Sequence, residues 1–199
     1  MRRGMTPFIS ELLETLQRFP QMRVGESRLH KGIFSAWIYR GDQAAMLVAS
    51  PDLPPVRLSP SGKKQYGAYT IHRDRPDWIK GDDPAQCSCY LVGWFDALAS
   101  ISGAEPFTAD LGRLTPGLDL VPDIRAIMQE VARRSALRVD GEDSLAWPGT
   151  RGRFQLRLAG ATVLISSEAG EYRIEGGTAG MVASAALGFM DGTSSQSDD

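Results

Sequence analysis

The chain contains a stretch that resembles another stretch of itself when the sequence is shifted by about 115 positions. Residues 6–24 then align with residues 121–139 without a gap, and the matches include Pro7 on Pro122, Arg18 on Arg133, and Arg23-Val24 on Arg138-Val139. Self-similarity over such a distance indicates a tandem of two related units. Two amphipathic helices also align at their apolar positions whatever their origin, because a core-facing stripe has the same helical spacing in both. Duplication is therefore a hypothesis, which the matched prolines and arginines favour.

Helix signals open and close each of the two units. Thr6-Pro7 and Asp83-Pro84 each combine an N-cap residue with a proline that suits the first helical position. Apolar residues follow each pair at helical spacing. We expect four helices, at residues 7–19, 84–102, 122–135 and 178–190.

Strand signals lie between the helices of each unit. Gly41-Asp42 stands between two apolar runs and is a two-residue hairpin signal. The expected strands are residues 22–25, 33–40, 43–50 and 67–73 in the first unit and 137–140, 153–159, 162–166 and 171–175 in the second. Strands that follow one another without helices imply antiparallel sheets. The predicted class is therefore α+β, with two pseudo-repeated helix–antiparallel sheet–helix units packed together.

The same signals divide the chain into four parts. A first α-β-α unit is expected at residues 6–103 and a second at residues 121–191. The intervening residues 104–120 hold two prolines and two glycines before Leu118 and are predicted to be a linker. The polar residues 192–199 are predicted to be a disordered tail.

Composition narrows the class of protein. Hydrophobic residues make up 42% and charged residues 23% of the chain, as in an ordinary globular protein. The formal net charge of −2 and the scattered Lys and Arg argue against nucleic-acid binding. No run approaches the roughly 20 apolar residues of a membrane helix, and no signal peptide is expected at the start. Cys87 and Cys89 are too close in sequence to join distant segments, which predicts a reducing, cytoplasmic location.

The strands of the two units differ in their patterning. In the second unit, apolar and polar residues alternate along residues 153–159 and 171–175, as in a sheet with one face in water. In the first unit, residues 33–40 and 43–50 are apolar on both faces, so both faces need a cover. That cover is the unit's own helices, the other unit, or a partner. Trp37 and Tyr39 are candidate interface residues, since their types are enriched at binding hot spots, and a homodimer through this face is one possibility.

Residues able to carry catalytic or metal chemistry are few. The only soft or imidazole ligands are Cys87, Cys89, His30 and His72. Two cysteines separated by one residue in a helix point about 200° apart, so they do not converge on one ion. We expect no catalytic residue, no metal site and no cofactor.

Two further segments have a functional and a plain interpretation. The most polar and aromatic cluster contains His72, Arg73, Arg75 and Trp78, which would bind an anion or would form a solvated loop with local Asp–Arg pairs. Residues 176–178, Gly-Gly-Thr, precede a helix and would cradle a phosphate or would form a turn with Thr178 as N-cap.

Two motifs carry a family resemblance. Residues 69–75 (Tyr-Thr-Ile-His-Arg-Asp-Arg) and residues 89–95 (Cys-Tyr-Leu-Val-Gly-Trp-Phe) form a strand with an Arg-bearing turn followed by a Tyr-Leu-x-x-x-Phe helix. This arrangement resembles actinobacterial polymorphic-toxin immunity proteins of the kind that neutralise the tuberculosis necrotizing toxin. The resemblance implies a non-enzymatic inhibitor that blocks the active site of a toxin. Secretion chaperones of helix–sheet–helix build are similar in outline and also imply protein binding.

The sequence therefore predicts a non-enzymatic protein-binding module, either an immunity protein that inhibits a toxin or effector, or a dedicated secretion chaperone. Its expected partner is another protein: a toxin, an effector or a secretion substrate. The alternative is a small ligand-binding protein or enzyme with a site near His72 and Arg73, between the two units.

Overall fold

The computed structural model describes residues 7–50, 53–57, 79–103, 108–118, 123–135, 137–139, 144–146, 153–167 and 170–194. The described helices are α1 (Pro7–Leu16), α2 (Pro84–Ile101), the short 3-10 helix η1 (Leu111–Leu114), α3 (Ile124–Arg134) and α4 (Ala179–Ser194). The strands are β1 (Met22–His30), β2 (Ile33–Arg40), β3 (Gln43–Ser50), β4 (Leu53–Arg57), β5 (Thr108–Asp110), β6 (Arg138–Val139), β7 (Ser144–Ala146), β8 (Arg153–Ala159), β9 (Thr162–Ser167) and β10 (Gly170–Glu175).

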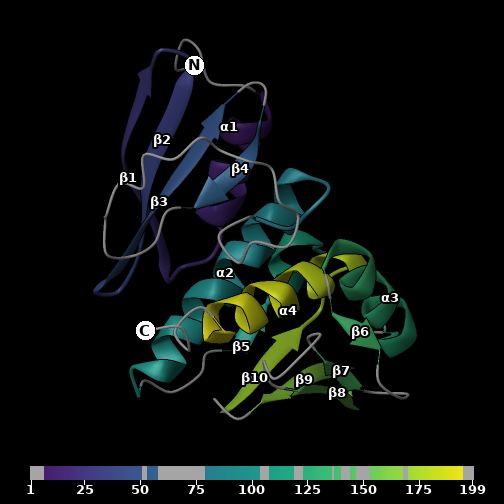
Figure 1. Ribbon diagram of the computed structural model, residues 1–199. Coiled ribbons are helices and arrows are strands. Elements are labelled where there is room, and N and C mark those ends of the chain that lie inside the picture. Colours follow the sequence, from purple (N-terminus) through teal and green to yellow (C-terminus); the bar gives the residue numbers. More distant parts are fainter. Residues whose placement is uncertain are drawn as a thin grey trace.

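Two sheets enclose a layer of helices. The first sheet has the strand order β1-β2-β3-β4, and the second has the order β5-β10-β9-β8-β7-β6. Figure 1 shows α2 and α4 lying between the two sheets, with α1 beside the first sheet and α3 at the end of the helical layer. The predicted α+β class is confirmed. No described helix has both the length and the apolar character required to cross a membrane.

The first sheet is a meander with tight turns. Arg40 pairs with Gln43, so Gly41 and Asp42 form the predicted two-residue turn, and Gly41 has a φ of 55° that suits its first central position. β1 extends to His30 rather than ending at residue 25 as predicted, and a second two-residue turn at Lys31-Gly32 joins it to β2. Lys31 and Gly32 both have positive φ. The sequence Ser-Arg-Leu-His lacks the apolar alternation of a half-buried strand, which is why this extension was missed.

α2 and α4 form a closely packed pair at the centre. The α2 residues from Cys87 to Ala99 are all buried, so this helix has no solvent-exposed face along most of its length. A Cβ at Gly93 would overlap the carbonyl oxygen of Ala185, and a Cβ at Gly188 would overlap that of Tyr90. Glycine on both helices therefore allows the backbones to approach each other. One buried cluster runs from α1 through both helices to the second sheet.

Two capping predictions are confirmed, those at Asp83 and Thr178, and a third cap, at Asp123, was not predicted. The Asp83 carboxylate accepts a hydrogen bond from the backbone N–H of Gln86 at 2.8 Å and starts α2. Asp123 caps α3 in the same way. The Thr178 hydroxyl accepts from the backbone N–H of Met181 at 3.3 Å and starts α4.

Residues 108–114, within the predicted linker, contribute to the fold. β5 pairs in parallel with β10 at the edge of the second sheet, and Ala109 and Leu111 are buried. α4 continues through residues 192–194, which were predicted to belong to the tail. The predicted strand at residues 67–73 lies outside the described residues.

Each half contains a helix, antiparallel strands and a second helix, in that order: α1, β1–β4 and α2, then α3, β6–β10 and α4. This order agrees with the predicted layout but does not demonstrate duplication, which stays a hypothesis.

Candidate interaction face of the first sheet

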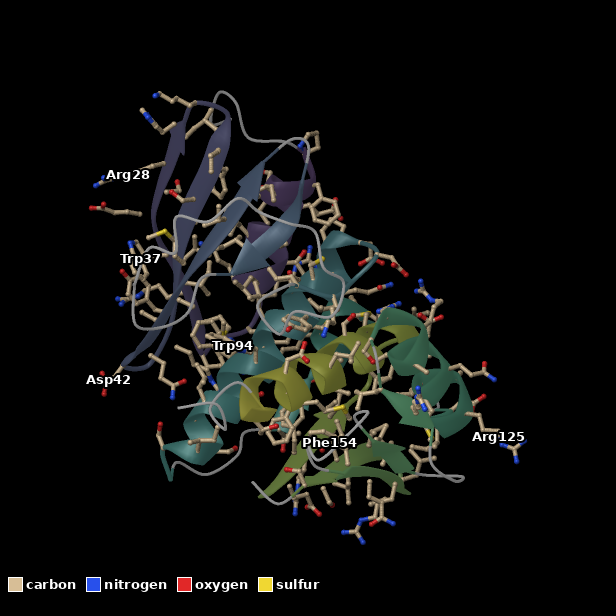
Figure 2. The ribbon with its side chains drawn as sticks, in the orientation of Figure 1. Arg28, Trp37, Asp42, Trp94, Arg125 and Phe154 are labelled. Atoms are coloured by element: carbon tan, nitrogen blue, oxygen red, sulfur yellow. The ribbon has the colours of Figure 1, made fainter. Side chains whose placement is uncertain are left out.

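The two faces of the first sheet have different surroundings. In β2, Phe34, Ala36, Ile38 and Arg40 are buried on the face that meets the helices. The alternate residues point to the other face, where Trp37 is half-buried. Figure 2 shows Trp37 and Arg28 on the side of this sheet that faces away from the helical layer. The unit's own helices therefore cover one apolar face, and the other is partly open.

Trp37 and Tyr39 form the centre of the open face. Their ring centroids are 6.3 Å apart, and the Arg23 guanidinium carbon lies 4.9 Å from the centroid of the Tyr39 ring. Met46 pairs with Trp37 and Ala44 pairs with Tyr39 across the β2–β3 ladder, which adds apolar surface beside the rings. We call these side chains, Arg23, Trp37, Tyr39 and Met46, the aromatic face.

A β-bulge shapes the edge of the aromatic face. The pairing register shifts between Val24 and Ser27, so Gly25 and Glu26 together lie opposite Trp37. A Cβ on Gly25 would stand 2.5 Å from Cε2 of Tyr39. The absence of a side chain at Gly25 therefore leaves room for the Tyr39 ring to lie over β1, where it meets Arg23.

The end of the β1–β2 hairpin has an exposed apolar residue on each face. Ile33, 45% exposed, lies on the same face as Trp37, whereas Leu29, 46% exposed, pairs with Phe34 and lies on the opposite face. Arg28 is also exposed and contacts Glu26 at 3.4 Å, with both side chains 80% accessible. An ion pair so exposed contributes little stability and exchanges readily with other partners.

The outer face of the second sheet is polar instead. Arg157 and Arg173 both contact Glu171, at 3.1 and 3.2 Å. Phe154 and Leu156 are buried, while Gln155 and Arg157 are exposed, which confirms the predicted alternation. Leu158, which was expected on the core side, is 43% exposed at the end of its strand. This face is a solvated surface held by ion pairs.

Two buried carboxylates lie in the helical layer. Asp96 of α2 forms an ion pair with Arg40 of β2, and Tyr172 of β10 lies near the same carboxylate. Burial raises the pKa of Asp96 to about 7, although Arg40 acts in the opposite direction.

The second buried carboxylate has the same kind of surroundings. Asp191 of α4 accepts hydrogen bonds of 2.7 Å from the Lys80 ammonium and from the Tyr90 hydroxyl. Both acids thus have a buried cation and a tyrosine as neighbours. Such pairing is what a buried charge needs within a folded chain, and it requires no ligand.

The two cysteines are buried in α2 and are not bonded to each other. Burial raises the pKa of the Cys87 thiol to about 12 and also raises that of Cys89, so both stay protonated. No group of three or more metal-ligating side chains occurs among the described residues.

Residues 176–178, Gly-Gly-Thr, form a turn that leads into α4. Gly176 and Gly177 have positive φ, and a Cβ at Gly176 would stand 2.7 Å from the backbone nitrogen of Gly112. The turn thus packs on η1 and Thr178 caps α4, and the chain itself fills the space beside Gly176.

The structure brings together Trp37 and Tyr39 among the predicted binding residues. His72, Arg73, Arg75 and Trp78 lie outside the described residues, so the alternative site there stays a prediction. Arg23 was not predicted as a site residue. Arg23 lies opposite Tyr39 on the neighbouring strand, and only the pairing register of β1 and β2 shows this.

Comparisons with protein-family models, with curated proteins and with solved structures find no match to this chain.

Proposed function

We propose that this chain is a non-enzymatic protein-binding module that presents the aromatic face of its first sheet to another protein. The observation that carries the proposal is the half-buried pair Trp37 and Tyr39, with Arg23 over the tyrosine ring, on the side away from the helices. Tryptophan, tyrosine and arginine are the residue types most enriched at the energetic centres of protein interfaces. The partner class is a toxin, an effector or a secretion substrate, and the role is that of an immunity protein or a dedicated chaperone in the cytoplasm.

Internal roles of the described ionisable groups support the proposal. Asp96 and Asp191 each contact a buried cation within the fold. Cys87 and Cys89 are buried protonated thiols, which are poor nucleophiles. These groups lie inside the fold, which leaves the aromatic face as the best-formed candidate for external contact.

Duplication of one α-β-α unit is part of the same proposal. The sequences Trp94-Phe95-Asp96 and Phe189-Met190-Asp191 each place a buried acid late in the second helix of a unit, beside a buried cation. The first copy carries the aromatic outer face, whereas the second carries ion pairs. Divergence of this kind would assign binding to the first copy and scaffolding to the second.

Affinity capture from the native cell lysate tests the proposal. The unmodified chain and a Leu158→Ser variant, altered at an exposed apolar residue of the second sheet, are expected to retain the same stoichiometric protein. A Trp37→Ser variant that keeps its circular dichroism spectrum is expected to lose it. Capture of no stoichiometric protein, or equal capture by all three chains, would contradict the proposal.

A further inference from the structure

The charges around the aromatic face are predominantly positive. Arg23, Arg28 and Lys31 are exposed in the β1–β2 hairpin, and Glu26 is its one acidic residue. None of the described carboxylates forms an ion pair with Arg23, whose guanidinium lies over the Tyr39 ring. The chain as a whole carries a formal net charge of −2, so this local excess of cations stands out against the rest of the sequence.

The position of Arg23 suits it to carboxylate binding. A guanidinium that lies over an aromatic ring contacts the ring without using its N–H groups, which stay available for two parallel hydrogen bonds to a carboxylate. Contact with the ring also limits the rotamers of the arginine, so less conformational entropy is lost on binding. Arg28 contributes a second cation, because its 3.4 Å contact with Glu26 is fully at the surface.

We infer that the aromatic face binds an acidic protein segment whose carboxylates contact Arg23 and Arg28 and whose apolar side chains pack on Trp37. This inference rests on the proposed protein-binding function and specifies the chemistry of the partner. Charge complementarity selects an acidic occupant over a second copy of this chain, since two copies would bring Arg23 and Arg28 of both hairpins together.

The test selects binders from a displayed library of random peptides against the purified full chain. Enriched peptides are expected to combine Asp or Glu with aromatic or branched apolar residues. Their affinity, measured by fluorescence anisotropy, is expected to fall about tenfold or more in Arg23→Glu and to weaken as salt is added. The matched control is Arg173→Glu, which reverses an exposed arginine on the second sheet and is expected to leave affinity unchanged.

Other outcomes distinguish failure of the acidic occupant from failure of the protein-binding face itself. Selected peptides without an acidic excess that lose binding in Trp37→Ser would overturn the acidic occupant but keep the protein-binding face. Peptides unaffected by both Trp37→Ser and Arg23→Glu would overturn both. A dimer by light scattering that Trp37→Ser converts to a monomer would assign the face to a second copy. Photo-crosslinks from p-benzoylphenylalanine at position 37 to residues 58–78 of the same chain would assign it to the chain itself, and either result overturns the inference.

Discussion

Arg40 of β2 and Asp96 of α2 form an ion pair that is buried at both ends, with side chains 4% and 0% exposed. The pair joins the first sheet to the central helix, and Tyr172 extends the contact to the second sheet. A buried charge that loses its partner is costly, whereas apolar replacement of the whole pair is often tolerated. The pair therefore allows a sharp test of how the two sheets are held together.

We expect Asp96→Ala to lower the free energy of unfolding by about 3–5 kcal/mol, because the Arg40 guanidinium would stay buried without its carboxylate. The triple change Arg40→Met, Asp96→Leu and Tyr172→Phe is expected to recover most of that loss. Urea denaturation followed by circular dichroism measures both. A triple variant as unstable as Asp96→Ala would show that the polar group itself is needed.

The pKa of Asp96 predicts a pH dependence of stability. Burial raises this pKa from 3.8 to about 7, so between those values the folded chain holds a proton that the unfolded chain has released. The free energy of unfolding is therefore expected to fall as pH rises through this window and to level off above it. Urea denaturation at about pH 5 and about pH 8 measures the difference, which Asp96→Asn is expected to reduce.

Asp82 and Glu130 do not produce the same slope. Hydrogen bonds from Arg133 lower the pKa values of Asp82 and Glu130. Their contribution to stability is lost only as the pH falls below their ordinary values near 4, outside the window of Asp96. An equal slope in the native chain and in Asp96→Asn would exclude Asp96 as its source.

The helix pair predicts opposite responses at two glycines of α4. A Cβ at Gly188 would overlap the backbone carbonyl of Tyr90, so Gly188→Ala must separate α2 from α4. At Gly180 the nearest atoms are the side-chain ends of Gln86 and Arg134, at 2.9 and 3.2 Å, and these move more easily. We expect Gly188→Ala to cost about 1–3 kcal/mol or more, despite the better helix propensity of alanine. Gly180→Ala is expected to change stability much less.

Thermal unfolding of both glycine variants measures this difference. A Gly188→Ala variant that melts at or above the temperature of the native chain would mean that the two helices are farther apart than described.

The parts of the fold that follow from local chemistry were predictable. Asp83-Pro84 marks the start of α2 because a capping carboxylate and a proline act on their own helix, and Gly41-Asp42 marks its hairpin for a similar reason. The placement of α2 was not predictable in this way. The apolar spacing of residues 84–102 predicted a helix with one buried face, whereas α2 is buried on every side because α1, α4 and the first sheet all pack on it.

Features that depend on distant pairing were also missed. β5 is three residues long and acquires its strand identity only from its parallel partner β10. Arg23 joins the aromatic face because the β1–β2 register brings it opposite Tyr39. Residue type and strand alternation predicted Trp37 and Tyr39 as interface residues, but they did not predict Arg23.

Adjacent arginines at the end of α3 provide the last prediction. The Arg134 side chain is 6% exposed and donates hydrogen bonds to the Gly180 carbonyl at 3.0 Å and to the Ser184 hydroxyl at 2.7 Å, both in α4. It also contacts Glu130 at 2.7 Å. The Arg133 side chain is 51% exposed and contacts only carboxylates among the described residues, those of Asp82 and Glu130. Arg134 therefore ties α3 to the central pair, whereas Arg133 lies at the surface.

We expect Arg134→Ala to lower the free energy of unfolding by about 2–4 kcal/mol, because it removes several hydrogen bonds from a charged group and leaves the part-buried Gly180 carbonyl and Ser184 hydroxyl of α4 without this donor. Arg133→Ala is expected to cost less than about 1 kcal/mol, since exposed ion pairs are weak and screened. Denaturation with urea in low and high salt distinguishes the two, because salt should reduce the effect at the exposed Arg133 more than the effect at the buried Arg134. Equal losses at both positions would indicate that α3 is held by its apolar residues Ile127, Met128 and Val131 alone.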